Sequence, residues 1–271
     1  MRYCIVDTFA GGGYLGNPAA VVSLRSFPAD DVMQDAAHRI RVPTTAFVVP
    51  VAAGEYRVRW FTPFAEVNLC GHATIGSARH LLAQPENAGR RQLRFESDNG
   101  VLCAQAVRDL IAIDLPKATL TVSDPPPGLL EALGLTAAVS CATSSDDVLV
   151  ELPSAEAVGV VSPDFAALGR QPFRGHIVTA PAASGADFVS RTFFPALGVD
   201  EDQVCVTAHC KLAPFWAQRL GRRALIALQL SERGGRLEVE DRADVVRVVG
   251  SAAPRGGVRE LALDAIATTK R

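Results

Sequence analysis

Short apolar runs separated by turn residues fill most of this chain, a pattern typical of strands rather than of long helices. In the first half, alternating or continuous apolar side chains predict strands at 4–8, 19–23, 46–51, 56–61, 93–96, 101–107 and 110–115. In the second half the same pattern predicts strands at 147–152, 175–180, 187–194, 225–231, 236–240 and 245–249. We therefore expect a fold rich in sheet.

A smaller set of segments carries helix signals. Two helices are predicted at 74–82 and 207–220, the second ending at Gly221, since glycine favours the left-handed cap that closes a helix. Further helices are predicted at 29–39, 129–133 and 163–168. Helices scattered among many strands predict an α+β protein.

The proline-rich stretch from Pro116 to Gly128 is the best candidate for a linker. We predict an N-terminal lobe at 1–116, a linker at 117–128 and a C-terminal lobe at 129–271, whose last residues can cross back to the first lobe. Each half offers a strand, a turn with cysteine and histidine, and then a helix. This order predicts two similar lobes that face each other across a cleft, each aiming a helix N-terminus inward.

Composition narrows the class of protein. The 271 residues are 48% hydrophobic and 21% charged with a net charge of −2, so nothing favours nucleic acid as a partner. No apolar run approaches the roughly 20 residues that span a bilayer, and the first residues resemble a strand rather than a signal peptide. We therefore expect a cytoplasmic protein, without a membrane partner, whose six cysteines are reduced. Without a Cys-x-x-Cys pair no metal site is predicted, and Cys4 and Cys103 are interpreted as small core residues.

The segment Cys70-Gly71-His72-Ala73-Thr74 carries the clearest chemistry. It lies where a predicted strand passes into a helix, and free N–H groups at a helix N-terminus attract anions. Gly71 allows a ligand to approach the backbone, and the His72 imidazole can exchange protons near neutral pH. The segment therefore predicts a carboxylate-binding site beside side chains that handle protons.

Several segments in chain order resemble one known family. They are Val6-Asp7-Thr8-Phe9, Gly16-Asn17-Pro18-Ala19-Ala20-Val21-Val22, Thr45-Ala46-Phe47-Val48, Phe61-Thr62-Pro63, Cys70-Gly71-His72-Ala73-Thr74, Asp187-Phe188-Val189-Ser190-Arg191, Ala208-His209-Cys210 and Val249-Gly250-Ser251-Ala252. On these residues the chain resembles the phenazine-biosynthesis-like (PhzF-like) isomerases, which share the diaminopimelate epimerase fold. The resemblance implies two pseudo-symmetric lobes, each with a central helix enwrapped by a mostly antiparallel sheet, and an active site between them. It also implies a homodimer that needs no cofactor.

Two positions depart from the family pattern. The family's usual glutamate, its general acid/base, corresponds to Thr44, whose hydroxyl cannot carry a proton near neutral pH. A glycine that faces the substrate in the family corresponds to Val206, whose branched side chain restricts close approach. The proton-carrying role is therefore predicted to be lost or moved, and the pocket to be reshaped.

The resemblance and the local chemistry select the candidate site residues. The catalytic candidates are His72, Asp202, which matches the family's aspartate, and Cys70. The substrate-binding candidates are Thr44, Thr45, Gly71, Ala73, Cys205, Val206, Thr207 and Ala208. Asp202 could instead be a solvated carboxylate in an acidic loop, and His72 and His209 could serve packing alone. Asn17 is interpreted as a turn former.

Three functions stay open. The leading hypothesis is a cofactor-independent isomerase that shifts a double bond in a small unsaturated or cyclic amino-acid-like carboxylic acid, in a biosynthetic pathway such as that of an antibiotic. The second is a two-thiol racemase or epimerase using Cys70 and Cys205, because a thiol at a helix N-terminus has a lowered pKa. The third is a non-catalytic binding protein that kept the fold.

Overall fold

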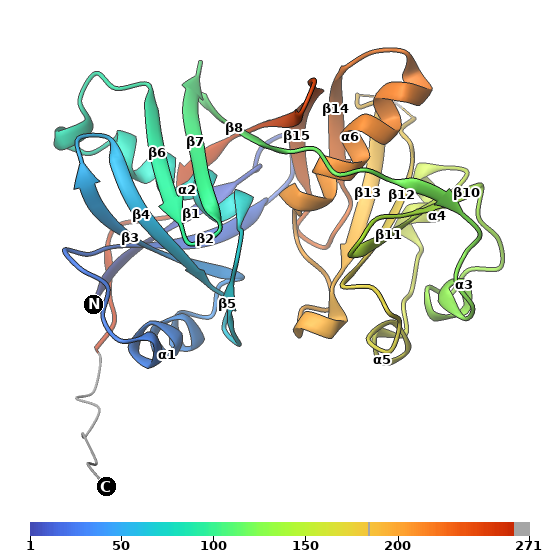
Figure 1. Ribbon diagram of the computed structural model, residues 1–271, viewed down its shortest axis with the longest axis horizontal. Coiled ribbons are helices and arrows are strands. Elements are labelled where there is room, and N and C mark those ends of the chain that lie inside the picture. The colour runs from blue at the N-terminus through green and yellow to red at the C-terminus, as the bar shows by residue number, and fades with distance from the viewer. Residues whose placement is uncertain (184, 263–271) are drawn as a thin grey trace, which may run out of the picture. The chain divides into compact units, whose positions relative to one another are not determined.

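The computed structural model describes residues 1–183 and 185–262 and shows a sheet-rich α+β fold, which confirms the predicted class (Figure 1). Contacts between Cα atoms divide the chain into two compact units. The first unit holds Met1–Thr8, Pro18–Ile111 and the segment that begins at Ala252, and the second holds Phe9–Asn17 and Ala112–Ser251. The division into lobes at 1–116, 117–128 and 129–271, and the cleft between them, stay predictions; residues 263–271 lie outside the described range.

The strands of the first unit surround one helix. They are β1 (Arg2–Thr8), β2 (Asn17–Ser23), β3 (Thr44–Ala52), β4 (Glu55–Phe61), β5 (Glu66–Val67), β6 (Gln92–Ser97), β7 (Gly100–Val107), β17 (Ala252–Pro254) and β18 (Arg259–Glu260). Strand β1 pairs with β2 and, antiparallel, with β17 and β18. Strand β2 then pairs parallel with β3, β3 antiparallel with β4, β4 parallel with β6, and β6 antiparallel with β7.

The second unit repeats this order of pairings. Its strands are β9 (Thr121–Ser123), β10 (Ser140–Thr143), β11 (Asp147–Glu151), β12 (Gly175–Pro181), β13 (Phe188–Phe193), β14 (Ala224–Gln229), β15 (Gly235–Asp241) and β16 (Val245–Gly250), and β16 also pairs with β8 (Leu110–Pro116). Strand β11 pairs parallel with β12, β12 antiparallel with β13, β13 parallel with β14, and β14 antiparallel with β15. The repeat confirms the predicted pseudo-symmetry.

Each unit has one long helix at the equivalent place in this order. Helix α2 (Gly71–Leu82) follows β4 and β5 and packs against β1, β3, β6, β7 and β17. Helix α6 (Val206–Leu220) follows β13 and packs against β14, β15 and β16. Most residues of α2 are buried because strands cover several of its faces, and a Cβ at Gly76 would already lie 3.5 Å from Val6 and Thr8. The predicted central helices are confirmed.

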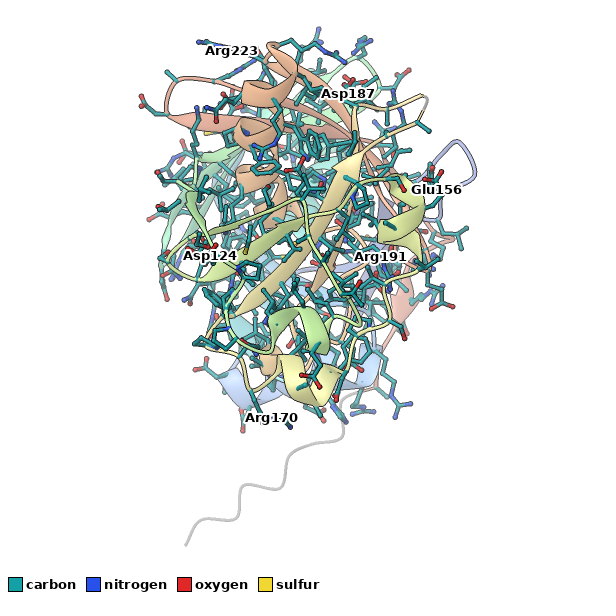
Figure 2. All side chains as sticks on the ribbon, turned by 90° about the vertical axis from the view of Figure 1, so that its right-hand side faces the viewer. Asp124, Glu156, Arg170, Asp187, Arg191 and Arg223 are labelled. Carbon is teal, nitrogen blue, oxygen red and sulfur yellow. The ribbon has the colours of Figure 1, made fainter. Side chains whose placement is uncertain are left out.

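The shorter helices lie beside the sheets. They are α1 (Asp30–Ile40), α3 (Leu129–Ala132), α4 (Ala155–Gly159), α5 (Phe165–Leu168) and the 3₁₀ turns η1 (Pro85–Asn87) and η2 (Pro195–Leu197). Of these, α1, α3 and α5 were predicted from the sequence. Strand β9 lies inside the stretch predicted to be a linker. Exposed charges such as Glu156, Arg170 and Arg223 occupy the surface of the second unit (Figure 2). Within the described residues, no helix is both long and apolar enough to cross a membrane.

Candidate functional site

The first unit brings Thr44, Cys70 and His72 together at the start of α2. Cys70 has the extended backbone of a helix N-cap, with φ −141° and ψ 101°. Its Sγ lies 3.3 Å from His72 Nδ1 and 3.5 Å from Thr44 Oγ1. Thr44 is the first residue of β3, so the end of the loop before β3 meets the start of the central helix. Cys70 therefore contacts both Thr44 and His72, and all three were selected from the sequence.

His72 is a neutral side chain at pH 7. It is only 6% exposed, and this burial lowers the pKa of the imidazole to about 4, because the charged form loses its water. At neutral pH the ring therefore offers one N–H donor and one acceptor rather than a positive charge. His72 can hydrogen-bond a substrate or accept a proton briefly, but it does not hold a proton ready to donate.

Two of the remaining candidates of the first unit, Gly71 and Ala73, lie at the same helix start, and Thr45 lies next to Thr44 in β3. Gly71 and Ala73 are buried in the first turn of α2, where the initial N–H groups have no partner within the helix. The first helical bond runs from Thr74 N to Cys70 O at 3.1 Å. The buried hydroxyl of Thr45 has no hydrogen-bond partner among the described residues. The first turn therefore keeps donors available for an anionic group.

In the second unit Cys205 is the N-cap of α6 and, unlike Cys70, also caps the helix with its side chain. Its Sγ accepts from the N–H of Ala208 at 3.4 Å and lies 3.3 Å from Thr207 Oγ1. The N–H of Cys205 donates to Gln229 Oε1 at 2.9 Å, which ties the helix start to β14. Val206 and Ala208 are buried. The predicted substrate-binding residues of this half therefore form one turn of backbone.

Asp202 is held firmly beside this turn. Asn17 Nδ2 donates to its Oδ1 at 2.7 Å, and its backbone oxygen accepts from Gln229 Nε2 at 2.6 Å. Burial raises the pKa of the Asp202 carboxyl, against hydrogen bonds from Cys205 and Asn17 that favour the charged form. Although the residue keeps some exposed surface, its carboxyl is packed and bonded, so Asp202 is not the solvated loop carboxylate of the alternative interpretation.

The pKa of the Cys205 thiol is raised, whereas its place at a helix N-terminus led us to expect a lowered pKa. Burial, followed by the negative charge of Asp202, raises its pKa well above the ordinary range. Desolvation outweighs the helix dipole here, because the dipole acts over a single turn whereas burial affects the whole thiolate. Cys205 is therefore a protonated thiol at neutral pH, and the lowered pKa assumed for it is wrong.

Three partners in the second unit were not identified from the sequence. Asn17 holds Asp202 rather than only forming a turn, and Gln229 bonds both Asp202 and Cys205. His209 is fully buried, with Nδ1 2.7 Å from the carbonyl of Cys205, and burial lowers its pKa to about 4. Only Asn17 and His209 lie in segments that resemble the family, so the sequence offered no signal for Gln229.

A buried ion pair joins helix α6 to strand β11. Lys211 Nζ lies 2.7 Å from Asp147 Oδ2, and their side chains are 5% and 0% exposed. Arg174 donates to the same carboxylate, from Nε at 3.1 Å and from Nη2 at 2.9 Å. Within residues 1–183 and 185–262, no group of three or more His, Cys, Asp or Glu side chains is placed to hold a metal ion.

Comparisons with known proteins cover nearly the whole chain. A family model described as phenazine biosynthesis-like protein matches residues 6–256. A Pseudomonas aeruginosa protein named as an uncharacterized isomerase is 44% identical over 248 residues, which cover 92% of this chain and 94% of that protein. An Enterococcus faecalis structure of the PhzF family has a TM-score of 0.88 at 37% identity and covers 96% of this chain and 99% of its own. A probable proline racemase from Agrobacterium radiobacter, with a TM-score of 0.65 at 11% identity over 98% and 94% of the two chains, shares the fold alone. The predicted diaminopimelate epimerase-like fold is confirmed.

Proposed function

This chain belongs to the phenazine biosynthesis-like family and is a cofactor-independent isomerase, and we propose that its reaction moves a proton on a small unsaturated or cyclic amino-acid-like carboxylic acid. The proton shift relocates a double bond. The resemblance also predicts that Thr44 stands where the family has its glutamate, so another group must carry the proton.

The observation that carries the proposal is the setting of Asp202. Burial raises the pKa of the Asp202 carboxyl, and a raised pKa makes a carboxylate a stronger base, as suits a general acid/base. Asn17 and the turn before α6 hold it in one orientation. His72, with its pKa lowered to about 4, contributes a neutral hydrogen-bonding ring instead. The pKa of Asp202 is raised and that of His72 is lowered, so we assign proton transfer to Asp202 and hydrogen bonding to His72.

Asp202 alone can both remove and return the proton, so the proposed reaction needs no second acid or base. The Asp202 carboxylate takes a proton from the carbon beside the double bond, the electron pair moves along the allylic system, and the carboxylic acid returns the proton at the far carbon. No electrons enter or leave. The substrate carboxylate binds to backbone N–H groups at a helix start, with Gly71 to Ala73 and Thr207 to Ala208 as the two candidate sets. In the second set, the substrate would replace the long contact of the Ala208 N–H with Cys205 Sγ.

Proton exchange with solvent tests the proposal without knowledge of the true substrate. The enzyme is incubated in deuterated water with a panel of unsaturated amino acids and cyclic dienyl carboxylic acids, and deuterium uptake is followed by mass spectrometry. We expect Asp202→Asn to slow exchange about 10²–10⁴-fold, the usual contribution of a positioned acid–base group. Asp200→Asn, at an exposed acid two residues away, is the matched control. Exchange within threefold of wild type in Asp202→Asn would reject Asp202 as the carrier.

The two-thiol racemase is the alternative that the same assay separates. It requires one thiolate and one thiol; because burial and Asp202 keep Cys205 protonated, Cys70 would have to supply the thiolate. We expect Cys205→Ser to retain exchange within about tenfold and iodoacetamide to leave most activity intact; abolished exchange in Cys205→Ser would favour the racemase. Because the chain is an isomerase, the non-catalytic alternative is set aside.

The finer expectations about cell biology belong to the same proposal. The six cysteines are free thiols, as a reducing cytoplasm would keep them. We place the enzyme there, in a biosynthetic pathway such as that of an antibiotic, acting as a homodimer. Light scattering that gives the mass of a single chain would reject the dimer.

A further inference from the structure

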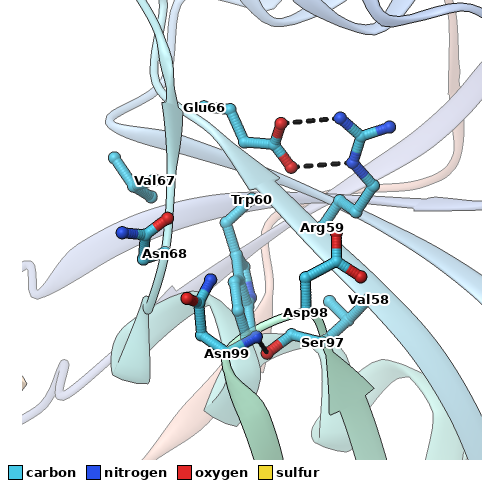
Figure 3. A pocket seen from close by; sticks show the side chains of 9 residues that line it. All are labelled: Val58, Arg59, Trp60, Glu66, Val67, Asn68, Ser97, Asp98 and Asn99. Atoms are coloured by element: carbon cyan, nitrogen blue, oxygen red, sulfur yellow. Dashed lines mark hydrogen bonds and ion pairs between the residues drawn. The ribbon is translucent and has the colours of Figure 1, made fainter.

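The first unit contains a pocket that uses none of the candidate site residues. It has a volume of about 270 Å³ and lies beside β4, β5 and the turn between β6 and β7 (Figure 3). Its lining consists of Val58, Arg59, Trp60, Glu66, Val67, Asn68, Ser97, Asp98 and Asn99. This volume is just below the ~300–1,000 Å³ of common small-molecule sites, so an occupant would be small.

The pocket lies where the sheet changes partners. The register of β4 with β6 ends at Arg57, and its register with β5 begins at Trp60. Val48 of β3 accepts from Leu24 N at 2.9 Å and so points away from β4. Its register partner Val58 therefore directs its own backbone groups away from β3, to the side where β6 and β5 lie. Between Arg57 and Trp60, β4 passes from one neighbour on this side to the other.

Trp60 places a buried donor at the same gap. The residue is 1% exposed, and its indole N–H has no hydrogen-bond partner within the described residues. Figure 3 shows its ring standing between Asn99 and Asp98. The other tryptophan differs, since Trp216 Nε1 donates to Thr179 Oγ1 at 2.9 Å. Because buried N–H groups almost always have a partner, the unpaired indole of Trp60 points to an acceptor that binds there.

The charges of the lining leave one carboxylate for a ligand. The Arg59 guanidinium is engaged by two carboxylates, Glu66 at 2.7 and 2.6 Å and Asp30 at 2.7 Å. Asp98 has a side chain that is 81% exposed, and its ion pair within the described residues is a long one, 3.5 Å to Arg57. The amides of Asn68 and Asn99 add neutral donors and acceptors. The lining is therefore polar and, on balance, negative.

We propose that this pocket is a second binding site, for a small molecule that carries an ammonium group and a hydrogen-bond acceptor. The ammonium group pairs with Asp98, and the acceptor takes the indole N–H of Trp60. Small side-chain shifts of Asn68 and Asn99 admit the ligand to the indole. The site is independent of the chemistry assigned to Asp202.

The two tryptophans provide the assay. In the ¹⁵N-labelled protein each indole gives its own NMR resonance, and Trp60→Phe assigns the pair. Glycinamide is the probe, because it carries an ammonium group and a carbonyl; N-acetylglycinamide, which lacks the ammonium, is its matched control. We expect glycinamide to shift the Trp60 resonance saturably at concentrations on the order of 1–10 mM, as suits so small a ligand, and to leave Trp216 unmoved.

Substitutions test whether Asp98 binds the ammonium group of the probe. Asp98→Asn should weaken glycinamide binding about tenfold or more, since it removes the charged partner, and N-acetylglycinamide should be weaker by a similar factor. Asp109→Asn, at an exposed acid of the same unit, should bind like wild type. A shift that does not saturate, that moves both indoles equally, or that persists unchanged in Asp98→Asn would overturn the proposal.

Discussion

Burial of His72 makes the stability of the first unit depend on pH, and His72→Gln should remove the part of that dependence that His72 causes; the part due to half-buried His80 remains. Glutamine keeps a polar side chain of similar reach that has no charge to gain. In acid, the unfolded wild-type chain binds a proton at residue 72, whereas the buried imidazole of the folded protein resists binding it. We therefore expect the two proteins to differ in acid and to converge at neutral pH.

The magnitude follows from the position of the pKa, which burial lowers from 6.5 to about 4. Between these values the unfolded chain binds one proton that folded His72 does not, so the free energy of unfolding falls as pH falls. The stabilisation is fully present above about pH 7 and is lost progressively toward pH 4. At about 1.4 kcal/mol per pH unit, the loss between pH 7 and pH 4 is about 3 kcal/mol.

Urea unfolding at a series of pH values from 7 to 4 measures this loss. All proteins in this series carry Trp216→Phe, so that the remaining Trp60 fluorescence reports on the first unit, which also contains His72. His72→Gln should lose about 3 kcal/mol less than wild type over this range. His38→Gln, at an exposed histidine of the same unit, should follow the wild-type curve. If the His72→Gln curve ran parallel to wild type, burial would not be what holds the imidazole neutral.

Two further substitutions test the packing of the second unit. Lys211→Met should lower the free energy of unfolding by about 3–5 kcal/mol, because it leaves the buried Asp147 carboxylate without one of its two cations. Urea unfolding measures this loss. A loss below about 1 kcal/mol would show that Arg174 alone is enough to stabilise the carboxylate. In Gly250→Ala the new Cβ would overlap the buried Phe9 ring, so we expect the free energy of unfolding to fall by about 1–3 kcal/mol. Gly257→Ala, where a Cβ would meet nothing within 4 Å, should leave it unchanged. Equal melting temperatures for the two variants would contradict this account.

Strands with clear apolar patterns were predictable, and very short elements were not. The period of two predicted the strands that became β3, β4 and β12 because one or both of their faces are buried. Strands β5 and β18 have two residues each, too few to show any period. Helix α2 begins at Gly71 rather than at the predicted 74, since its first turn is fixed by the Cys70 cap and not by apolar spacing. Cys103 is exposed, so its interpretation as a core residue is wrong.

The candidate site was predictable where its residues are neighbours in the chain. Cys70 and His72 are two residues apart, and their contact follows from the helix start. The hydrogen bond from Asn17 to Asp202 joins positions 185 residues apart, and no local pattern signals it. Burial decides the pKa of Cys205, and burial is a property of the finished fold rather than of the sequence around a residue.

The way the chain passes between the units bears on how the protein folds. Residues 9–17 complete the second unit, and β17, which begins at Ala252, pairs with β1 in the first. The first unit is therefore complete only when the strands from Ala252 onward are present, and the second only when residues 9–17 are present. For the same reason, two fragments produced by cutting at residue 117 would each lack a piece that the other carries. Neither fragment should fold fully by itself, and mixing the two should restore the missing strand pairings.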